Sequence, residues 1–196
     1  MIREAVSAIV LAGGRSRRFG RDKLAEPIDG RPLLEHAIEA VRPWADQTVV
    51  VVGPEGSPPR ALPAGVIVAR DPAPFEGPLV GLRSGLAVAT NPIVLVAAGD
   101  TPVLVPAVIE ALLAALDDLG VDAVILGHGE GPWPFPMALR RIPAEGAAAR
   151  LVAGGERRLM ALPDALAARV IDEADWRALD PNGRTLHDID TPADLS

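Results

Sequence analysis

The sequence predicts an α/β fold built on a mainly parallel sheet. Apolar runs alternate along the chain with segments of helical periodicity, and this order implies right-handed crossovers between parallel strands. The runs are rich in Val and Ile and nearly continuous, which is typical of strands covered on both faces. With 196 residues, 49% of them hydrophobic, the chain is expected to form one domain, residues 1–196, around a sizeable core.

Strands and helices alternate over the first two thirds of the chain. Strands are predicted at 6–11, 48–52, 66–69, 93–98 and 123–126. A helix is predicted over 32–41, because apolar residues at 34, 37, 38 and 41 form one stripe and a proline near the start costs little. Two further helices are predicted over 79–89 and 106–119, and each also begins beside a proline.

The last third of the chain has a different pattern. Large apolar residues alternate with prolines over 133–139, and proline cannot donate to a sheet ladder. This segment is therefore predicted to be an edge strand or a wall beside a cleft. Helices are predicted over 143–154 and 156–162, followed by a strand at 168–171 and a terminal turn at Thr191-Pro192.

Composition and charge exclude several classes of protein. A net charge of −7 argues against a nucleic-acid partner, since such proteins usually present a dominant basic surface. The absence of cysteine rules out disulfides, thiol catalysis and cysteine-bound zinc. The apolar run 5–12 is flanked by charges and is too short to span a membrane, so we expect no membrane partner and a cytoplasmic location.

A candidate phosphate loop follows the first strand. Gly13 and Gly14 can adopt positive φ, so that backbone N–H groups converge on an anion. The stretch 15–23 then supplies four arginines, Arg18 among them, and the only lysine of the chain, Lys23. These cations could neutralise a triphosphate, although the P-loop and dinucleotide spacings are both absent. A solvated basic turn is the alternative.

Aspartates lie after several of the predicted strands. Asp100 ends the run that begins at residue 93, and in open α/β sheets ligands bind beyond the carboxyl ends of strands. A divalent cation is the favoured partner of Asp100, with helix capping as the alternative. Asp188 or Asp190 could complete the metal shell, or Asp190 could cap a short helix. Asp71 precedes a proline-stiffened loop that could shape a cleft or simply connect two elements.

Two further groups could contact a second substrate. Arg157 and Arg158 are adjacent and could grip a second phosphate-bearing molecule, although an arginine pair on a helix is often only a solvated face. Trp133, Phe135 and Met137 could line an apolar wall, but such residues more often belong to the core.

Taken in order, these segments resemble the MobA-like nucleotidyltransferases, and more narrowly the molybdenum cofactor guanylyltransferases. The similarity runs from the first strand to the C-terminus. It is carried by the motifs Leu11-Ala12-Gly13-Gly14-x-Ser16-x-Arg18-Phe19-Gly20-x-Asp22-Lys23, Gly77-Pro78-Leu79-Val80-Gly81, Asp100-Thr101-Pro102, Gly155-Glu156-Arg157-Arg158 and Asp190-Thr191-Pro192.

The resemblance implies a three-layer, Rossmann-like sandwich of the nucleotide-diphospho-sugar transferase type. The implied reaction moves GMP from GTP to molybdopterin, with Mg²⁺ as cofactor and pyrophosphate as product. Acceptor molybdoenzymes or cofactor-handling proteins are further expected partners. The implied site residues are Leu11, Ala12, Gly13, Gly14, Lys23, Asp71 and Asp100 for the nucleotide, Lys23, Arg18 and Asp100 for catalysis, Asp100 and Asp190 for the metal, and Arg157 and Arg158 for the acceptor.

Two departures from the family pattern bear on the base. The segment 52–55 lacks the asparagine that helps the family to read guanine, and the closing motif carries Asp188 and Asp190 where asparagines are frequent. Cytidylyl transfer to the same cofactor is therefore an alternative. A nucleotide-binding regulatory module without turnover is a second one, which Lys23 and Asp100 argue against.

Overall fold

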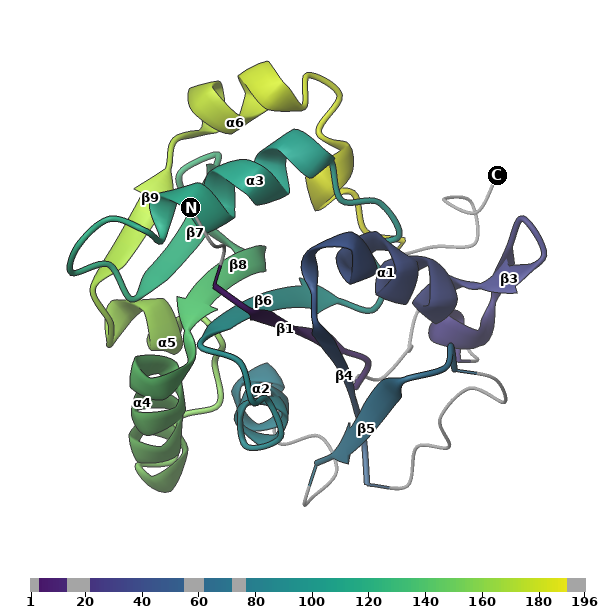
Figure 1. The fold of residues 1–196 in the computed structure, drawn as a ribbon, viewed down its shortest axis with the longest axis horizontal. Coiled ribbons are helices and arrows are strands. Elements are labelled where there is room, and N and C mark those ends of the chain that lie inside the picture. Colours follow the sequence, from purple (N-terminus) through teal and green to yellow (C-terminus); the bar gives the residue numbers. More distant parts are fainter. Residues whose placement is uncertain (1–3, 14–21, 55–61, 72–76, 190–196) are drawn as a thin grey trace.

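The computed structural model describes residues 4–13, 22–54, 62–71 and 77–189, and these form a sandwich around one large sheet (Figure 1). The strand order in this sheet is β5-β4-β1-β6-β8-β7-β9. Its strands are β1 (Val6–Leu11), β4 (Gln47–Val52), β5 (Val66–Arg70), β6 (Ile93–Ala98), β7 (Ala123–His128), β8 (Gly131–Arg140) and β9 (Ala168–Ile171). A small hairpin pairs β2 (Pro27–Ile28) with β3 (Arg31–Pro32). The predicted α/β class and the mainly parallel sheet are confirmed.

Strand β8 runs against its neighbours, whereas the other strands of the large sheet are mutually parallel. The prediction of an edge strand over 133–139 is wrong, because β8 lies between β6 and β7. Residues 137–139 pair with both neighbours, but the register with β7 then shifts so that Trp133 lies opposite Leu126. Pro134 and Pro136 fall in this shift, where the ladder does not need their missing N–H groups.

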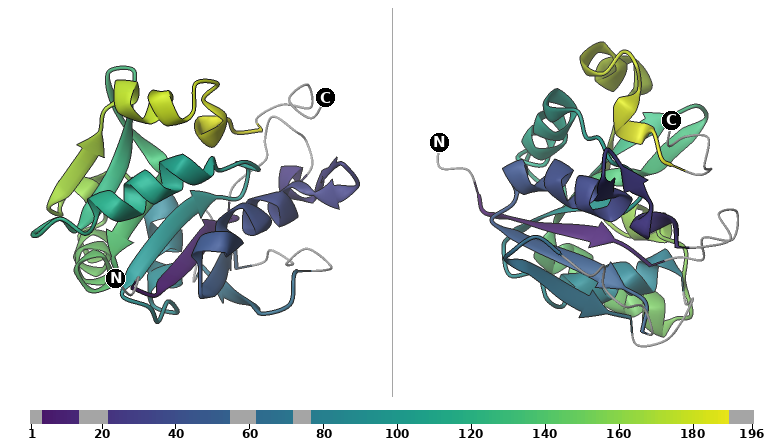
Figure 2. Two further views of the ribbon diagram at one scale, coloured as in Figure 1. Left: turned by 45° about the horizontal axis from the view of Figure 1, so that its top comes forward. Right: turned by 90° about the vertical axis from the view of Figure 1, so that its right-hand side faces the viewer.

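Helices cover both faces of the sheet (Figures 1 and 2). One face carries α1 (Leu33–Val41), α3 (Pro106–Ala115) and α6 (Glu173–Leu179), and the other carries α2 (Pro78–Leu86), α4 (Arg141–Ala153) and α5 (Ala161–Asp164). The predicted stripe of α1 is buried at all four positions. Short 3-10 turns, η1 (Lys23–Ala25), η2 (Arg42–Trp44) and η3 (Arg184–Leu186), complete the described elements. Among the described residues, no helix is long and apolar enough to cross a membrane.

Two predictions about helices need correction. The helix predicted over 156–162 is reduced to α5, and residues 156–158 are not helical. Gly155 has a φ of +88°, and the Glu156 carboxylate accepts the backbone N–H groups of the next two residues, which competes with helical hydrogen bonding. Helix α3 ends at Ala115 rather than near 119, and Gly120 adopts a φ of +83° in the turn that follows.

Helix α2 lies unusually close to the sheet. A Cβ atom built on Gly85 would lie 2.7 Å from Cγ2 of Ile9 in β1 and 3.0 Å from Cγ2 of Val51 in β4. These side chains are buried and cannot swing aside freely. The glycine therefore sets the distance between α2 and the two strands that lead toward the candidate site.

Alanine substitution tests this close approach. Both Gly85→Ala and Gly146→Ala gain about 1 kcal/mol of helix propensity, but a Cβ at Gly146 meets only a flexible arginine end at 3.4 Å. We expect Gly146→Ala to stabilise the protein and Gly85→Ala to fall about 1–3 kcal/mol below it, because of overpacking. Urea unfolding of the two variants measures the difference, and equal stabilisation by both would contradict the close packing.

Candidate functional site

The carboxyl ends of β1 and β6 meet at one edge of the sheet. Leu11 pairs with Ala98 in parallel register, and the N–H of Gly99 donates to the carbonyl oxygen of Leu11 at 2.9 Å. A Cβ at residue 99 would lie 3.1 Å from that oxygen and 3.4 Å from Cα of Ala12. Glycine therefore allows the chain segments that leave the two strands to lie against each other.

Lys23 and Asp100 form an ion pair at this edge. The Nζ atom of Lys23 lies 2.7 Å from Oδ2 of Asp100, and the two side chains are only 17% and 23% exposed. Lys23 begins η1, whose first turn is capped by the Asp22 carboxylate through a 3.1 Å bond from the N–H of Leu24. The two residues predicted to contact one nucleotide are thus in direct contact, although they are 77 positions apart.

Ile189, the last residue that the structure describes, contacts the same site. The backbone N–H of Ile189 donates to the carbonyl oxygen of Asp100 at 3.0 Å, and Lys23 Nζ donates to the carbonyl oxygen of Ile189 at 3.1 Å. Asp188, one of the two candidates for a second metal ligand, directly precedes this bonded residue in the chain. The ammonium group of Lys23 therefore contacts two oxygens, one of the Asp100 carboxylate and one of the Ile189 carbonyl.

Asp71 follows β5 and lies between β1 and α2. Its backbone N–H donates to Val52, and its Oδ1 accepts a 3.2 Å hydrogen bond from the hydroxyl of Ser84 in α2. Cβ atoms built on Gly13 and Gly81 would lie 3.9 and 3.4 Å from Oδ2 of Asp71. The predicted residues Gly13 and Asp71 are therefore neighbours, and the glycine of α2 makes room for the carboxylate.

Several predicted site residues lie outside the described part of the chain. These are Gly14, Arg18 and Asp190, together with the terminal turn at Thr191-Pro192. Among the described residues, no group of three or more His, Cys, Asp or Glu side chains could hold a metal ion. Asp100 and the carbonyl of Ile189 both contact the ammonium of Lys23 through hard oxygens, the donor type that Mg²⁺ prefers, so their chemistry fits the predicted magnesium.

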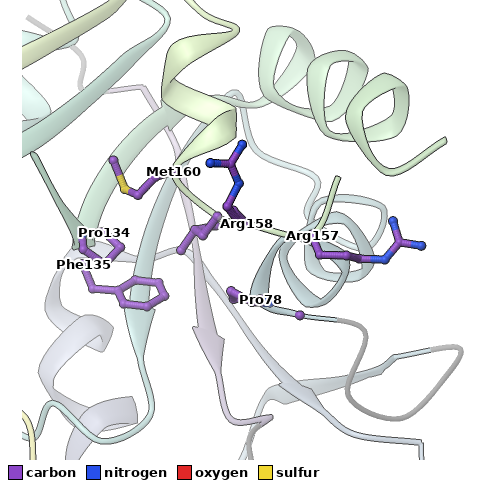
Figure 3. A pocket seen from close by; sticks show the side chains of 8 residues that line it. Pro78, Pro134, Phe135, Arg157, Arg158 and Met160 are labelled. Atoms are coloured by element: carbon purple, nitrogen blue, oxygen red, sulfur yellow. The ribbon is translucent and has the colours of Figure 1, made fainter. Parts of the chain in front are cut away.

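A pocket of about 570 Å³ opens beside the start of α2 (Figure 3). Apart from two arginines its lining is apolar or glycine. The lining residues are Gly77, Pro78, Pro134, Phe135, Arg157, Arg158, Leu159 and Met160. Of the aromatic and Met residues considered as a wall, Phe135 lines this pocket, whereas Met137 is fully buried in the core.

The segment 156–160 is docked onto α2 at the pocket. The N–H of Leu79 donates to the carbonyl oxygen of Arg157 at 3.3 Å. Gly77 has a φ of +97°, and a Cβ there would lie 2.8 Å from the same oxygen, so glycine is required on both counts. The Gly-Pro-Leu motif therefore brings the start of α2 against the segment that carries the arginine pair.

Glu156 organises this segment, and sequence reasoning missed it. Its carboxylate accepts the backbone N–H groups of Arg157 and Arg158 at 2.8 and 2.9 Å, and Arg158 Nη2 lies 2.7 Å from it. The side-chain hydrogen bond from Arg158, followed by the two backbone bonds, lowers the pKa of Glu156 to about 2. The available signal was an acidic residue directly after a glycine pair, where a helix cannot continue.

The low pKa of Glu156 can be measured directly. Since the folded pKa lies below the ordinary value of 4.5, the stabilisation that this carboxylate contributes is complete above pH 4.5 and is lost as the pH falls toward 2. We expect the Glu156 carboxyl carbon to titrate near pH 2 by NMR, and nearer 4.5 in Arg158→Gln. A midpoint near 4.5 in the unsubstituted protein would contradict the hydrogen-bonded geometry.

Comparison with known sequences shows the family. The MobA-like NTP transferase domain matches residues 8–170. A probable molybdenum cofactor guanylyltransferase of Chloroflexus aggregans is 37% identical, across 97% of this chain and 91% of its own length. The molybdenum cofactor guanylyltransferase of Desulfosudis oleivorans is 32% identical, across 98% of this chain and 93% of its own.

Solved structures of nucleotidyltransferases are similar to this fold. Molybdopterin-guanine dinucleotide biosynthesis protein A from Archaeoglobus fulgidus has a TM-score of 0.75 and 25% identity, covering 96% of this chain and 94% of its own. The 2-C-methyl-D-erythritol 4-phosphate cytidylyltransferase of Thermus thermophilus has a TM-score of 0.69 at 18% identity, covering 95% and 94%, and shows the fold alone. The predicted sandwich of the nucleotide-diphospho-sugar transferase type is confirmed. From the matched domain and the near full-length relatives, we conclude that this chain belongs to the MobA-like NTP transferase family.

Proposed function

We propose that this nucleotidyltransferase moves GMP from GTP to the phosphate of the molybdenum cofactor, molybdopterin, and releases pyrophosphate. The relatives at 32–37% identity are named molybdenum cofactor guanylyltransferases, which favours guanylyl over cytidylyl transfer. The observation that carries the proposal is the contact between Lys23 and Asp100 at the carboxyl edge of the sheet. Open α/β sheets bind ligands at this edge. A nucleotide needs a cation for its phosphates, which Lys23 supplies, and a carboxylate for its metal counter-ion, which Asp100 supplies.

The reaction needs no nucleophile from the protein. An oxygen of the acceptor phosphate is already anionic; it forms a bond to the α-phosphorus of GTP while the bond to the pyrophosphate oxygen breaks. The barrier is charge crowding and alignment, so the protein acts by positioning and by electrostatics. The backbone of Leu11, Ala12, Gly13 and Gly14 is the proposed contact for the nucleotide. The N–H of Ala12 already donates to the carbonyl oxygen of Val51 at 2.8 Å, so the N–H groups proposed to cradle the phosphates are those of the two glycines.

The charged residues have distinct roles in this proposal. Lys23 and Arg18 stabilise the negative charge that grows on the departing pyrophosphate. Asp71, held by Ser84 and lying beside Gly13, contacts the nucleotide. Asp100 fixes the position of the Lys23 ammonium, which keeps this cation at the strand end before substrate arrives.

Magnesium is the proposed cofactor, held by Asp100 and Asp190. The fit rests on Asp100 and the Ile189 carbonyl, which together hold the ammonium cation of Lys23 in the structure. When bound, Mg²⁺ would screen the charges of the α- and β-phosphates.

The acceptor is proposed to bind in the pocket lined by Phe135 and Met160, with its phosphate at the segment that carries Arg157 and Arg158, the pair predicted for the acceptor, of which at least one supplies the cation. Acceptor molybdoenzymes or cofactor-handling proteins are proposed as partners, in the cytoplasm and without nucleic acid or membrane. A phosphate-bearing ring system matches a pocket of apolar walls and cationic side chains.

Pyrophosphate release tests the function. We expect release from GTP in the presence of molybdopterin and Mg²⁺, loss of release when EDTA removes the metal, and little release with CTP. Isothermal titration should show GTP bound far more tightly than CTP under Mg²⁺. Turnover with CTP alone would establish the cytidylyl alternative, and binding of nucleotide without any turnover would establish the regulatory module.

Lys23→Ala tests the role of the lysine. Loss of one preorganised cation should lower kcat about a hundredfold, or about 3 kcal/mol, with the fold retained by circular dichroism. Arg42→Ala is the matched control, because Arg42 lies in η2 before the amino end of β4 and pairs with Glu39. Near-normal turnover of a folded Lys23→Ala protein would remove Lys23 from the mechanism.

A further inference from the structure

Arg157 is built into the framework of the fold. Its guanidinium donates to the carbonyl oxygens of Val152 at 3.1 Å and Glu156 at 2.9 Å. Val152 lies in the last turn of α4, and its carbonyl oxygen also accepts the N–H of Gly155 at 3.0 Å, so Arg157 adds a side-chain bond to the end of this helix. Its own carbonyl receives the N–H of Leu79 at the start of α2. Arg157 thus joins α4 to α2, and Figure 3 shows its guanidinium directed away from Phe135 and Met160.

Arg158 has a different environment. Its side chain is 82% exposed, and it donates to the Glu156 carboxylate from Nε at 3.2 Å and from Nη2 at 2.7 Å. A guanidinium has five N–H donors, so Glu156 engages fewer than half of them. Arg158 can therefore accept a further anion without the loss of any contact that holds a helix or strand in place.

An anionic ligand in this pocket can pair only with a charged side chain of the lining, and the charged residues of the lining are its two arginines. Its walls are formed by Pro78, Pro134, Phe135, Leu159 and Met160, which offer no charge. The start of α2 also borders the pocket, but the N–H of Leu79 is already used by the Arg157 carbonyl. An anionic group on a ligand whose ring lies against these walls must therefore find its partner in the exposed arginine.

Glu156 fixes the direction of that arginine. The carboxylate holds the turn through two backbone N–H groups and holds the Arg158 side chain at the same time. One side chain therefore couples the shape of the turn to the position of the guanidinium. A phosphate that reaches Arg158 shares the guanidinium with Glu156, and planar guanidinium groups can bind two oxygen anions at once.

We propose that the arginine pair is divided by role: Arg158 binds the anionic group of the acceptor, Glu156 is its positioning residue, and Arg157 is structural. This inference rests on the proposed function, because the acceptor is taken to be molybdopterin. It assigns acceptor recognition to one arginine of two that are adjacent in sequence.

Matched glutamine variants separate the roles. For Arg158→Gln we expect the Kd and KM for molybdopterin to rise about 10- to 100-fold, as for loss of a charge-assisted hydrogen bond, with the KM for GTP and the Tm unchanged. Arg158→Lys should recover part of the affinity. Arg157→Gln should lower the Tm by several degrees while the Kd for molybdopterin of the folded protein stays within about threefold of the original.

Glu156→Gln keeps an oxygen acceptor for the backbone but loses the charge that orients Arg158. We expect the KM for molybdopterin to rise while the KM for GTP stays constant; equal changes in both would make Glu156 merely structural and overturn its assigned role.

Unsubstituted protein that neither binds nor converts molybdopterin would refute the proposed function and this assignment with it. Binding and turnover by the unsubstituted protein, with unaltered molybdopterin affinity in Arg158→Gln, would overturn the assignment alone.

Discussion

The parallel pairing of β1 with β6 is the constraint on which the site depends. Parallel strands end at the same edge, and the bond from Gly99 to Leu11 holds the two ends together. A Cβ atom at residue 99 would lie 3.1 Å from the Leu11 carbonyl oxygen and 3.2 Å from a methyl carbon of Leu34 in α1, so any larger residue would have to displace its neighbours slightly, and glycine fits without strain. The close contact brings Asp100 within reach of Lys23, and through Ile189 it brings the C-terminal segment to the same point.

Electrostatics then sets what this edge can bind. The protein carries a net charge of −7, which on its own repels a polyphosphate. The stretch 15–23 carries five cationic side chains and one carboxylate, which reverses the sign locally. Lys23 of this stretch lies 2.7 Å from Asp100, and this ion pair fixes the place of its ammonium group. An excess of positive charge therefore follows β1 along the sequence of an acidic protein, which is what an anionic substrate requires.

Much of this arrangement could be predicted from the sequence, and what could not has physical reasons. The strands at 6–11 and 93–98 were predicted at their observed bounds, because continuous Val and Ile runs identify strands covered on both faces. The rule for strand ends and the family resemblance placed Asp100 and Lys23 at one nucleotide site, but their direct ion pair was not predicted. The interior position of β8 could not be inferred, because a register shift accommodates its prolines, and such shifts leave no local signal. The turn at Glu156 was missed because a carboxylate bound to backbone N–H groups looks, in sequence, like a helix start.

Helix α2 connects the two halves of the proposed reaction. Its first residues, Gly77 and Pro78, border the apolar pocket, and two turns later Ser84 holds Asp71 beside Gly13. An α-helix advances 1.5 Å per residue, so about 9 Å of rigid backbone separates Pro78 from Ser84. Gly85 lets the same helix pack closely against β1 and β4, and this close packing leaves the helix little freedom to shift. A reaction without a protein nucleophile depends on alignment of its two substrates, and one rigid element that touches both sites supplies that alignment at no further entropic cost.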